Sequence, residues 1–178
     1  MAVLIRLAAG VDAAAIAAIY RPYVETSRIS FEEVAPEAGE IERRMAQPLH
    51  PWLVIEDEGR VIGYASTSPL RGRSAYRFSV ETGLYLEPGT HGRGLGRALL
   101  SAHLELLARQ GFVTAIAGIS LPNAASVALH EKLGFVLGGI ERGVGFKLGE
   151  WVDVGRWQKD LAPRSQTPSE PMPPTEVA

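Results

Sequence analysis

Three glycines at alternate positions, Gly92, Gly94 and Gly96, carry the clearest chemical signal in this sequence. The segment before them alternates like a strand and the segment after them has the period of a helix, which places the glycines in a tight turn. Glycine lets a backbone come close to a ligand, and the N–H groups that begin a helix attract anions. Arg93 and Arg97 are placed to pair with further phosphates. The spacing therefore predicts a loop that binds a pyrophosphate.

Two common nucleotide-binding motifs do not fit this turn. A dinucleotide fingerprint that began at Gly94 would need Gly or Ala where the chain has Leu99, and one that began at Gly92 would fail at Arg97. A P-loop ends in Gly-Lys-Ser/Thr, a triplet that the sequence lacks. For the turn taken alone, the alternative of a glycine turn that serves only helix packing stays open.

A second polar group lies on a helix that Pro122 and Asn123 open and Gly134 ends. Asn123, Ser126 and His130 are spaced at i, i+3 and i+7, so they share one face of that helix. The simpler alternative is that Asn123 only caps the helix and that His130 is a surface or core histidine.

Both segments resemble the two signatures of the GNAT acetyltransferases. The turn is similar to their pyrophosphate loop, Gln/Arg-x-x-Gly-x-Gly/Ala, with His91 at the first position, and the helix is similar to their Asn-led helix that ends in Leu-Gly-Phe. Within that superfamily, residues 3–161 resemble the phosphinothricin N-acetyltransferases and their methionine-sulfoximine-acetylating relatives. The segments that match in order are 24–31, 51–54, 71–76, 80–81 and 149–155.

The resemblance implies acetyl-CoA as the cosubstrate and a set of contacts to the donor. No metal is expected, because the histidines lack ligand spacing and there is no cysteine. The strand before the turn would pair with the pantetheine arm, the turn would hold the pyrophosphate, and the polar helix face would border the arm. The residues implied are Leu84, Tyr85, Leu86, Gly92, Arg93, Gly94, Leu95, Gly96, Arg97, Asn123 and Ser126.

The resemblance also implies two catalytic residues and an acceptor site. Glu81 matches the family's proposed catalytic carboxylate, and His130 stands where this family also has histidine. Thr82 replaces a histidine found in many methionine-sulfoximine relatives, which leaves the substrate rank order open. The residues implied for the acceptor are Phe31, Arg71, Gly72, Arg73, Glu81, Thr82 and Gly83. A homodimer with the C-terminal strands in contact is implied as well.

The chemistry of these side chains suits the roles. An α-ammonium must lose a proton before its nitrogen attacks a thioester, and Glu81 is the candidate base, directly or through a water. The N–H of Leu84 or a neighbour would stabilise the oxyanion, and His130 would supply a proton or a donor to the departing thiolate. Arg71 and Arg73 would clamp an acceptor carboxylate or phosphinate. For Glu81 the alternative is a purely structural role as a strand carboxylate paired with Arg77. For Arg71 and Arg73 the alternative is an exposed loop whose arginines contact only solvent.

The elements that must position these residues follow from the periodicities. Strands are expected at Val3–Leu7, 52–56, 61–66, 78–87, 112–119, 136–144 and 152–159, and helices from Asp12, at 37–45, at 94–109 and from Asn123. Pro22 is expected to kink or shorten the first helix, and 112–119 to be covered on both faces. The order βααβββαβαββ predicts an α/β fold, a GNAT-like three-layer α/β/α sandwich around a mixed, mostly antiparallel sheet.

Composition limits the other possibilities. The 178 residues carry 18 Lys+Arg and 20 Asp+Glu, a net charge of −2 that does not favour nucleic acid. There is no cysteine, no apolar run long enough for a membrane span, and no metal-ligand spacing among the four histidines. These features predict a cytoplasmic protein. Residues 1–161 form the expected domain, and the proline-rich residues 162–178 are expected to be a flexible tail with almost nothing to bury.

The leading hypothesis is an acetyl-CoA-dependent N-acetyltransferase that acts on the α-amino group of a small glutamate-like amino acid, with Glu81 as the base. A second hypothesis keeps the donor but changes the acceptor to another small amine, a polyamine or a peptide N-terminus. A third is a non-catalytic module that senses coenzyme A.

Overall fold

A computed structural model describes residues 3–177, which form one seven-stranded sheet and four α-helices. The strands are β1 (Val3–Leu7), β2 (Leu53–Asp57), β3 (Arg60–Pro69), β4 (Ser79–Leu86), β5 (Thr114–Leu121), β6 (Val136–Lys147) and β7 (Glu150–Asp160). The helices are α1 (Ala13–Thr26), α2 (Ala38–Met45), α3 (Leu95–Gln110) and α4 (Ala124–Lys132). The predicted order of elements is confirmed.

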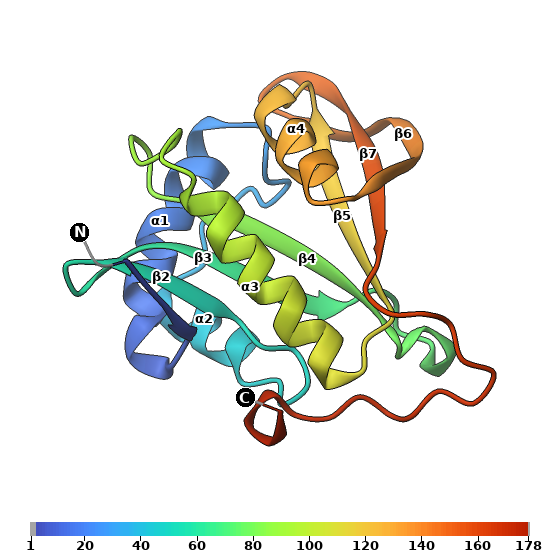
Figure 1. Ribbon diagram of the computed structural model, residues 1–178. Coiled ribbons are helices and arrows are strands. Elements are labelled where there is room, and N and C mark those ends of the chain that lie inside the picture. The colour runs from blue at the N-terminus through green and yellow to red at the C-terminus, as the bar shows by residue number, and fades with distance from the viewer. Residues whose placement is uncertain (1–2, 178) are drawn as a thin grey trace.

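The sheet has the strand order β1-β2-β3-β4-β5-β7-β6 and is antiparallel except between β4 and β5. Helices α1 and α2 lie on one face of it and helix α3 crosses the other (Figure 1). The α4 helix packs on the same side as α3, over β5 and β7. The expected three-layer α/β/α sandwich with a mixed, mostly antiparallel sheet is therefore confirmed.

Helix α3 illustrates how the apolar pattern builds the core. Its buried residues recur at helical spacing, so they form one stripe that packs on the sheet; they are Leu95, Leu99, Leu100, Leu104 and Leu107, with Leu106 beside them. Gly111 ends the helix with φ of +97°, a left-handed conformation that glycine adopts without strain. The stripe fixes the start of α3, and with it the glycine turn, against β4.

Two local expectations are wrong. The first is that Pro22 shortens helix α1: the helix continues to Thr26, because its buried face, which includes Tyr20 and Val24, packs on the sheet and offsets the lost N–H donor. A kink at Pro22 stays a prediction. Strand β5 is interior, but it is not covered on both faces: Gly118 is exposed. The face of β5 that bears Gly118 opens instead onto the cavities described below.

The described part of the tail, residues 162–177, contacts the domain. The Met172 N–H donates to the Gln110 carbonyl and the Gln110 side-chain amide donates to the Met172 carbonyl, both at 2.8 Å. Arg77 pairs with Glu170 at 2.9 Å, and Pro174 is buried. The proline-rich composition of this segment predicts almost nothing to bury, so these contacts differ from the expectation. The domain boundary and the mobility of the tail stay predictions.

All helices within residues 3–177 are too short or too polar to serve as a membrane span.

Candidate active site

The site is built around a gap in the sheet between β4 and β5. The two strands pair only where residues 79–81 face residues 114–116. Beyond that point β4 stays paired with β3 and β5 with β7, but not with each other. The only parallel pair of the described sheet therefore splays open and leaves strand backbone without a partner.

The backbone groups that face this gap follow from the pairing of β3 with β4. The N–H of Glu87 donates to the carbonyl of Ile62 at 2.8 Å. Because alternate residues of an antiparallel strand bond to the same neighbour, Leu84 and Leu86 direct their N–H and C=O groups away from β3 and toward the gap. The Leu86 carbonyl already accepts from the Tyr23 hydroxyl at 2.5 Å. The remaining groups suit an extended chain with amides, such as a pantetheine arm.

The glycine turn lies at the wide end of the gap. Gly92 and Gly94 have φ of +81° and +77°, which explains glycine at both positions. Gly94 caps α3 without a side-chain hydrogen bond, so the N–H groups of the first helical turn are left for a ligand. Gly96 instead allows the start of α3 to pack closely on β4, because an added Cβ there would lie 3.4 Å from Leu84 Cδ2. The turn therefore offers backbone donors for an anion.

The side chains of the turn are less uniform than the resemblance implies. Arg93 donates to Asp57 at 2.9 Å and so already has a carboxylate partner, while Arg97 is exposed. His91 lines the gap, with Nε2 3.2 Å from the Tyr23 hydroxyl oxygen. The anion site therefore consists mainly of backbone N–H groups and not of these arginine side chains.

Helix α4 forms the other wall of the gap. The Asn123 side chain accepts the Ser126 N–H at 3.1 Å, so Asn123 caps the helix and also lines the gap. His130 is buried, and its Nδ1 lies 2.8 Å from the Ser126 carbonyl oxygen. A carbonyl only accepts, so Nδ1 bears the proton and Nε2 of the neutral ring is an acceptor. Burial lowers the pKa of His130, which favours this neutral form.

Three cavities meet at Tyr85 and Gly118. The first is the gap itself, which we call the donor cleft; it includes Thr82, Gly83, Leu84, Leu86, His91, Gly96, Asn123, Ser126 and His130. The second and third lie on the side of α1 and α2 and are both lined by Glu81; we call them together the acceptor cavity. Most of the residues that the sequence analysis implied for donor and base are therefore brought to one place.

Glu81 is paired with an arginine that the sequence analysis did not single out. Arg156 Nη1 donates to Glu81 Oε1 at 2.7 Å, and Arg156 also binds Glu141 at 3.2 Å. Gly118 makes room for the pair, since a Cβ there would lie 2.7 Å from Arg156 Nη1 and 3.0 Å from Glu81 Oε1. The alternative pairing of Glu81 with Arg77 is wrong, because that arginine binds Glu170.

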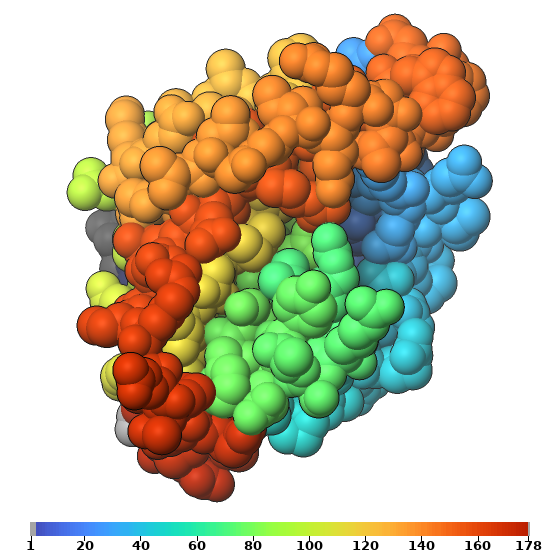
Figure 2. All heavy atoms as spheres, turned by 90° about the vertical axis from the view of Figure 1, so that its right-hand side faces the viewer, coloured from blue at the N-terminus to red at the C-terminus, as the bar shows by residue number. Residues whose placement is uncertain are grey.

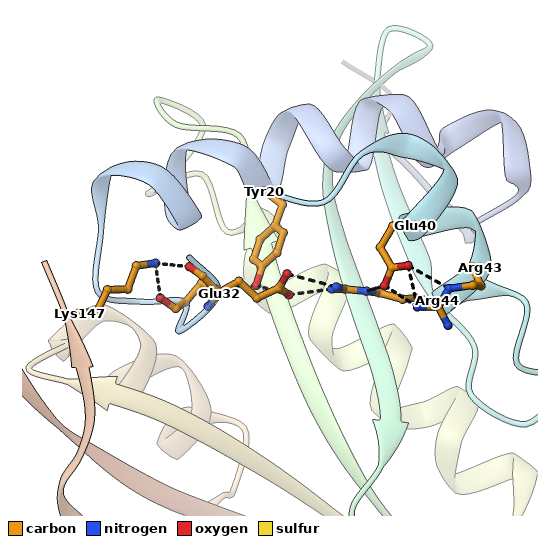
Figure 3. Close-up of polar contacts among 7 residues, drawn as sticks. Tyr20, Glu32, Glu40, Arg43, Arg44 and Lys147 are labelled. Atoms are coloured by element: carbon orange, nitrogen blue, oxygen red, sulfur yellow. Dashed lines mark hydrogen bonds and ion pairs between the residues drawn. The ribbon is translucent and has the colours of Figure 1, made fainter. Parts of the chain in front are cut away.

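One wall of the acceptor cavity is the loop that follows α1, and β6 holds it in place. The Lys147 ammonium donates to the carbonyls of Ser30 and Glu32 at 2.6 and 2.7 Å (Figure 3). Burial lowers the pKa of Lys147, although Glu32 acts in the opposite direction. The Phe31 ring lies against Gly145, where an added Cβ would be 2.2 Å from a ring carbon. Phe31 thus lines the cavity at the expected wall.

The Glu32 carboxylate joins this wall to helices α1 and α2. Arg44 donates to both carboxylate oxygens at 2.7 and 3.1 Å, and it also binds Glu40 at 2.7 Å (Figure 3). The Tyr20 hydroxyl donates to Glu32 at 3.1 Å and lies 2.6 Å from the Ser30 hydroxyl. The loop is therefore fixed by charge and hydrogen bonds on both sides.

Aromatic rings floor the acceptor cavity. Trp52 stacks on Tyr64 with ring centroids 5.4 Å apart, and Tyr64 stacks on Tyr85 at 5.3 Å. Tyr85 in turn meets the edges of Tyr20 and Tyr23 at 4.8 and 5.1 Å. Burial raises the pKa of Tyr64 and of Tyr85 well above 10, so both remain neutral phenols. This stack leads from the acceptor cavity to the donor cleft.

The predicted arginine clamp is not brought to these cavities. Arg71, Gly72 and Arg73 lie in the exposed loop between β3 and β4 and line none of the three. Figure 2 looks onto this loop (green), below the C-terminal hairpin (orange) and beside the N-terminal segments (blue). A role of these residues toward the acceptor stays a prediction. Thr82 and Gly83, by contrast, line both the donor cleft and the acceptor cavity.

Within residues 3–177, no three His, Asp or Glu side chains gather in a way that could hold a metal ion.

The gap in the sheet with its free strand backbone, the helix start that offers N–H donors to an anion, and the carboxylate of Glu81 in the adjoining acceptor cavity suit an acyl-group transferase. The chain belongs to the acetyltransferase (GNAT) family, whose model matches residues 16–135. It is an N-acetyltransferase, and acetyl-CoA is its cosubstrate. The free groups of the Leu84 and Leu86 backbone and the open first turn of α3 fit this cosubstrate.

Three relatives show how specific the match is. The chain is 39% identical over 171 residues to a phosphinothricin N-acetyltransferase of Streptomyces viridochromogenes, covering 95% of this chain and 91% of that one. It is 38% identical over 160 residues to an L-methionine sulfoximine/L-methionine sulfone acetyltransferase of Salmonella typhimurium, covering 88% and 94%. A phosphinothricin acetyltransferase of Sinorhizobium meliloti, solved in complex with AcCoA, superimposes with a TM-score of 0.90 at 39% identity, covering 96% and 95%.

Proposed function

We propose that this enzyme transfers the acetyl group of acetyl-CoA directly to the α-amino group of a small glutamate-like amino acid of the phosphinothricin or methionine sulfoximine type. The relatives named above act on such compounds. The observation that carries the proposal is the position of Glu81, which lines the acceptor cavity, while that cavity shares Tyr85 and Gly118 with the donor cleft.

Glu81 is the general base of the proposed reaction. Arg156 occupies Oε1 of the carboxylate, which leaves Oε2 to accept a proton from the acceptor ammonium, directly or through a water. Bound acetyl-CoA supplies a thioester carbonyl for the resulting amine to attack. The Leu84 N–H, which faces the gap, donates to the carbonyl oxygen as it gains negative charge.

His130 protonates the departing thiolate. Its Nδ1–H is already held by the Ser126 carbonyl, so the ring must gain a proton at Nε2 before it can give one. The acetylated nitrogen must lose a second proton, and neutral His130 is an acceptor for it. The same proton then passes to the thiolate, which balances the reaction.

The test is release of free thiol from acetyl-CoA in the presence of single acceptors: phosphinothricin, methionine sulfoximine, glutamate, spermidine and a peptide amine. N-acetylphosphinothricin, whose amine is blocked, is the control. Turnover confined to the first two supports the proposal. Turnover only of spermidine or of the peptide would mean that the enzyme is an acetyltransferase with a different acceptor from the one proposed. Binding of acetyl-CoA without turnover of any amine would indicate a sensor and overturn the proposal.

We also propose that the protein is a homodimer with the C-terminal hairpin β6–β7 in contact. Large apolar side chains are exposed along this edge of the sheet; they are Val136, Leu137, Ile140, Val144, Phe146, Leu148 and Trp151. Sedimentation equilibrium of W151E tests it, since a charge in this patch should dissociate the dimer. V11E, at an exposed valine of the N-terminal region, is the matched control. A native monomer, or a W151E dimer as stable as the native one, contradicts the proposal.

A further inference from the structure

Glu81 lines both parts of the acceptor cavity, and each part has one cationic side chain among its described lining residues: Arg156 in the second cavity and Arg44 in the third. The other charged lining residues are carboxylates: Glu32, Glu81 and Glu141. An amino acid presents one positive and one negative group to such a site. The ammonium has several carboxylates as possible partners, whereas for the α-carboxylate the possible partners are Arg156 and Arg44.

The spacing of the pair matches the head group of an amino acid. The nitrogen and the carboxylate carbon of an α-amino acid are separated by about 2.5 Å, as the bond lengths and the angle at Cα require. The amine must approach Glu81 to lose its proton, so the carboxylate must lie beside that residue. Arg156 Nη1 is 2.7 Å from Glu81 Oε1, which places a cation at the required position.

Arg156 keeps donors for a ligand. A guanidinium has five N–H groups in a planar fork. One of them serves Glu81, and Nε and Nη2 share a single oxygen of Glu141 at 3.2 Å, which leaves one N–H on each terminal nitrogen. Arg44 also keeps an N–H on each terminal nitrogen, but its partners are Glu32 and Glu40, whereas the guanidinium that binds Glu81 is that of Arg156.

We propose that Arg156 binds the α-carboxylate of the acceptor and thereby makes the enzyme select amino acids over amines that lack this group. The inference rests on the proposed function and adds a residue to it. Glu81 receives the ammonium on Oε2, Arg156 receives the carboxylate on its free N–H groups, and Glu141 fixes the guanidinium from the opposite side. Selection for the α-carboxylate therefore resides in β7, a strand of the C-terminal hairpin.

The experiment compares each amino acid with its own α-carboxamide, which keeps the amine and the side chain but has no negative charge at Cα. The quantity measured is the ratio of kcat/KM for the acid to kcat/KM for the amide. Substitution of Arg156 also disturbs Glu81, but any effect on proton removal acts on both substrates and cancels in the ratio. The variants are R156Q, R156K, which keeps the charge but loses the fork, and R142Q, a matched control at an exposed arginine on β6.

The native enzyme should favour the acid, and R156Q should lower the ratio by about 10- to 100-fold through KM for the acid, the usual effect of losing a charged hydrogen bond. R156K should retain an intermediate ratio, and R142Q the native one. Acetyl-CoA affinity should be unchanged in all three, which shows that R156Q is folded. A native enzyme that acetylates acid and amide equally, or an unchanged ratio in R156Q, overturns the inference alone. A native enzyme that acetylates neither compound contradicts the proposed function as well.

Discussion

Replacing Glu81 by Gln separates its structural role from its chemical one. The substitution keeps the shape of the side chain but removes the charge that faces Arg156. Both side chains of this pair are about one third exposed, 33% and 30%, and pairs so exposed contribute about 0–1 kcal/mol. Arg156 also keeps its second partner, Glu141. The free energy of unfolding of E81Q should therefore fall by no more than about 1 kcal/mol.

The catalytic effect should be far larger. Loss of a general base typically costs about 10²- to 10⁴-fold in rate, so kcat for phosphinothricin in the thiol-release assay should fall by that factor in E81Q. E141Q is the matched control, because it also removes one carboxylate from Arg156 and from the same cavity but not the proposed base. Its kcat should change by less than about 5-fold, the equivalent of a half-exposed ion pair. Equal losses in the two variants would refute Glu81 as the base and leave only a charge effect on Arg156.

Three further outcomes can be checked on the same protein. Burial lowers the pKa of His103 from the usual 6.5 of an exposed imidazole to about 4. Between pH 6.5 and 4 the unfolded chain is protonated at this residue and the folded chain is not, so stability should fall by roughly 3 kcal/mol as the pH drops through this range. Urea unfolding of H103Q should show a correspondingly smaller loss; an equal loss would contradict the assignment. In G118A the added methyl group must displace the ends of the Arg156 and Glu81 side chains, and since both are flexible, kcat/KM should fall by about 10-fold or more while the thermal midpoint moves little; native kcat/KM would show that the reaction tolerates this displacement. A chain that ends at residue 161 loses the two hydrogen bonds between Gln110 and Met172 of the tail, each of which contributes about 0.5–1.5 kcal/mol; an unchanged unfolding midpoint would indicate a tail that is mobile in solution.

The sequence predicts the elements well because each is determined by local physics. The alternation of residues 78–87 separates Val80 from Glu81 without any knowledge of their neighbours, and Gly134 ends α4 at a positive φ as expected. Pro22 marks the limit of such rules. Its local preference is to end a helix, but the burial of Tyr20 and Val24 against the sheet outweighs it.

The polar partners could not be predicted in the same way, because they join residues that are far apart in the chain. Arg156 meets Glu81 across β5, and only the register of β7 on β5, which sets Arg156 opposite Gly118, decides that contact. Lys147 reaches the loop after α1 through an equally distant pairing. Nearness in the sequence points to Arg77 as the partner of Glu81, and nothing in the local pattern excludes that pairing. Tail contacts with Gln110 were missed for the same reason.

The donor cleft and the acceptor cavity differ in how far the local sequence determines them. The donor cleft is made mainly of backbone: strand N–H and C=O groups that face the gap, and the first turn of α3. A glycine pattern in the sequence specifies such a surface, and it tolerates His91 at the first position of the motif and Arg93 turned to Asp57. The acceptor cavity is made of side chains from α1, β4, β6 and β7, whose charges meet only after folding. Family resemblance therefore predicts the donor-binding residues of this chain well. The acceptor must instead be inferred from contacts such as that of Arg156 with Glu81, and from assays that vary the acceptor one group at a time.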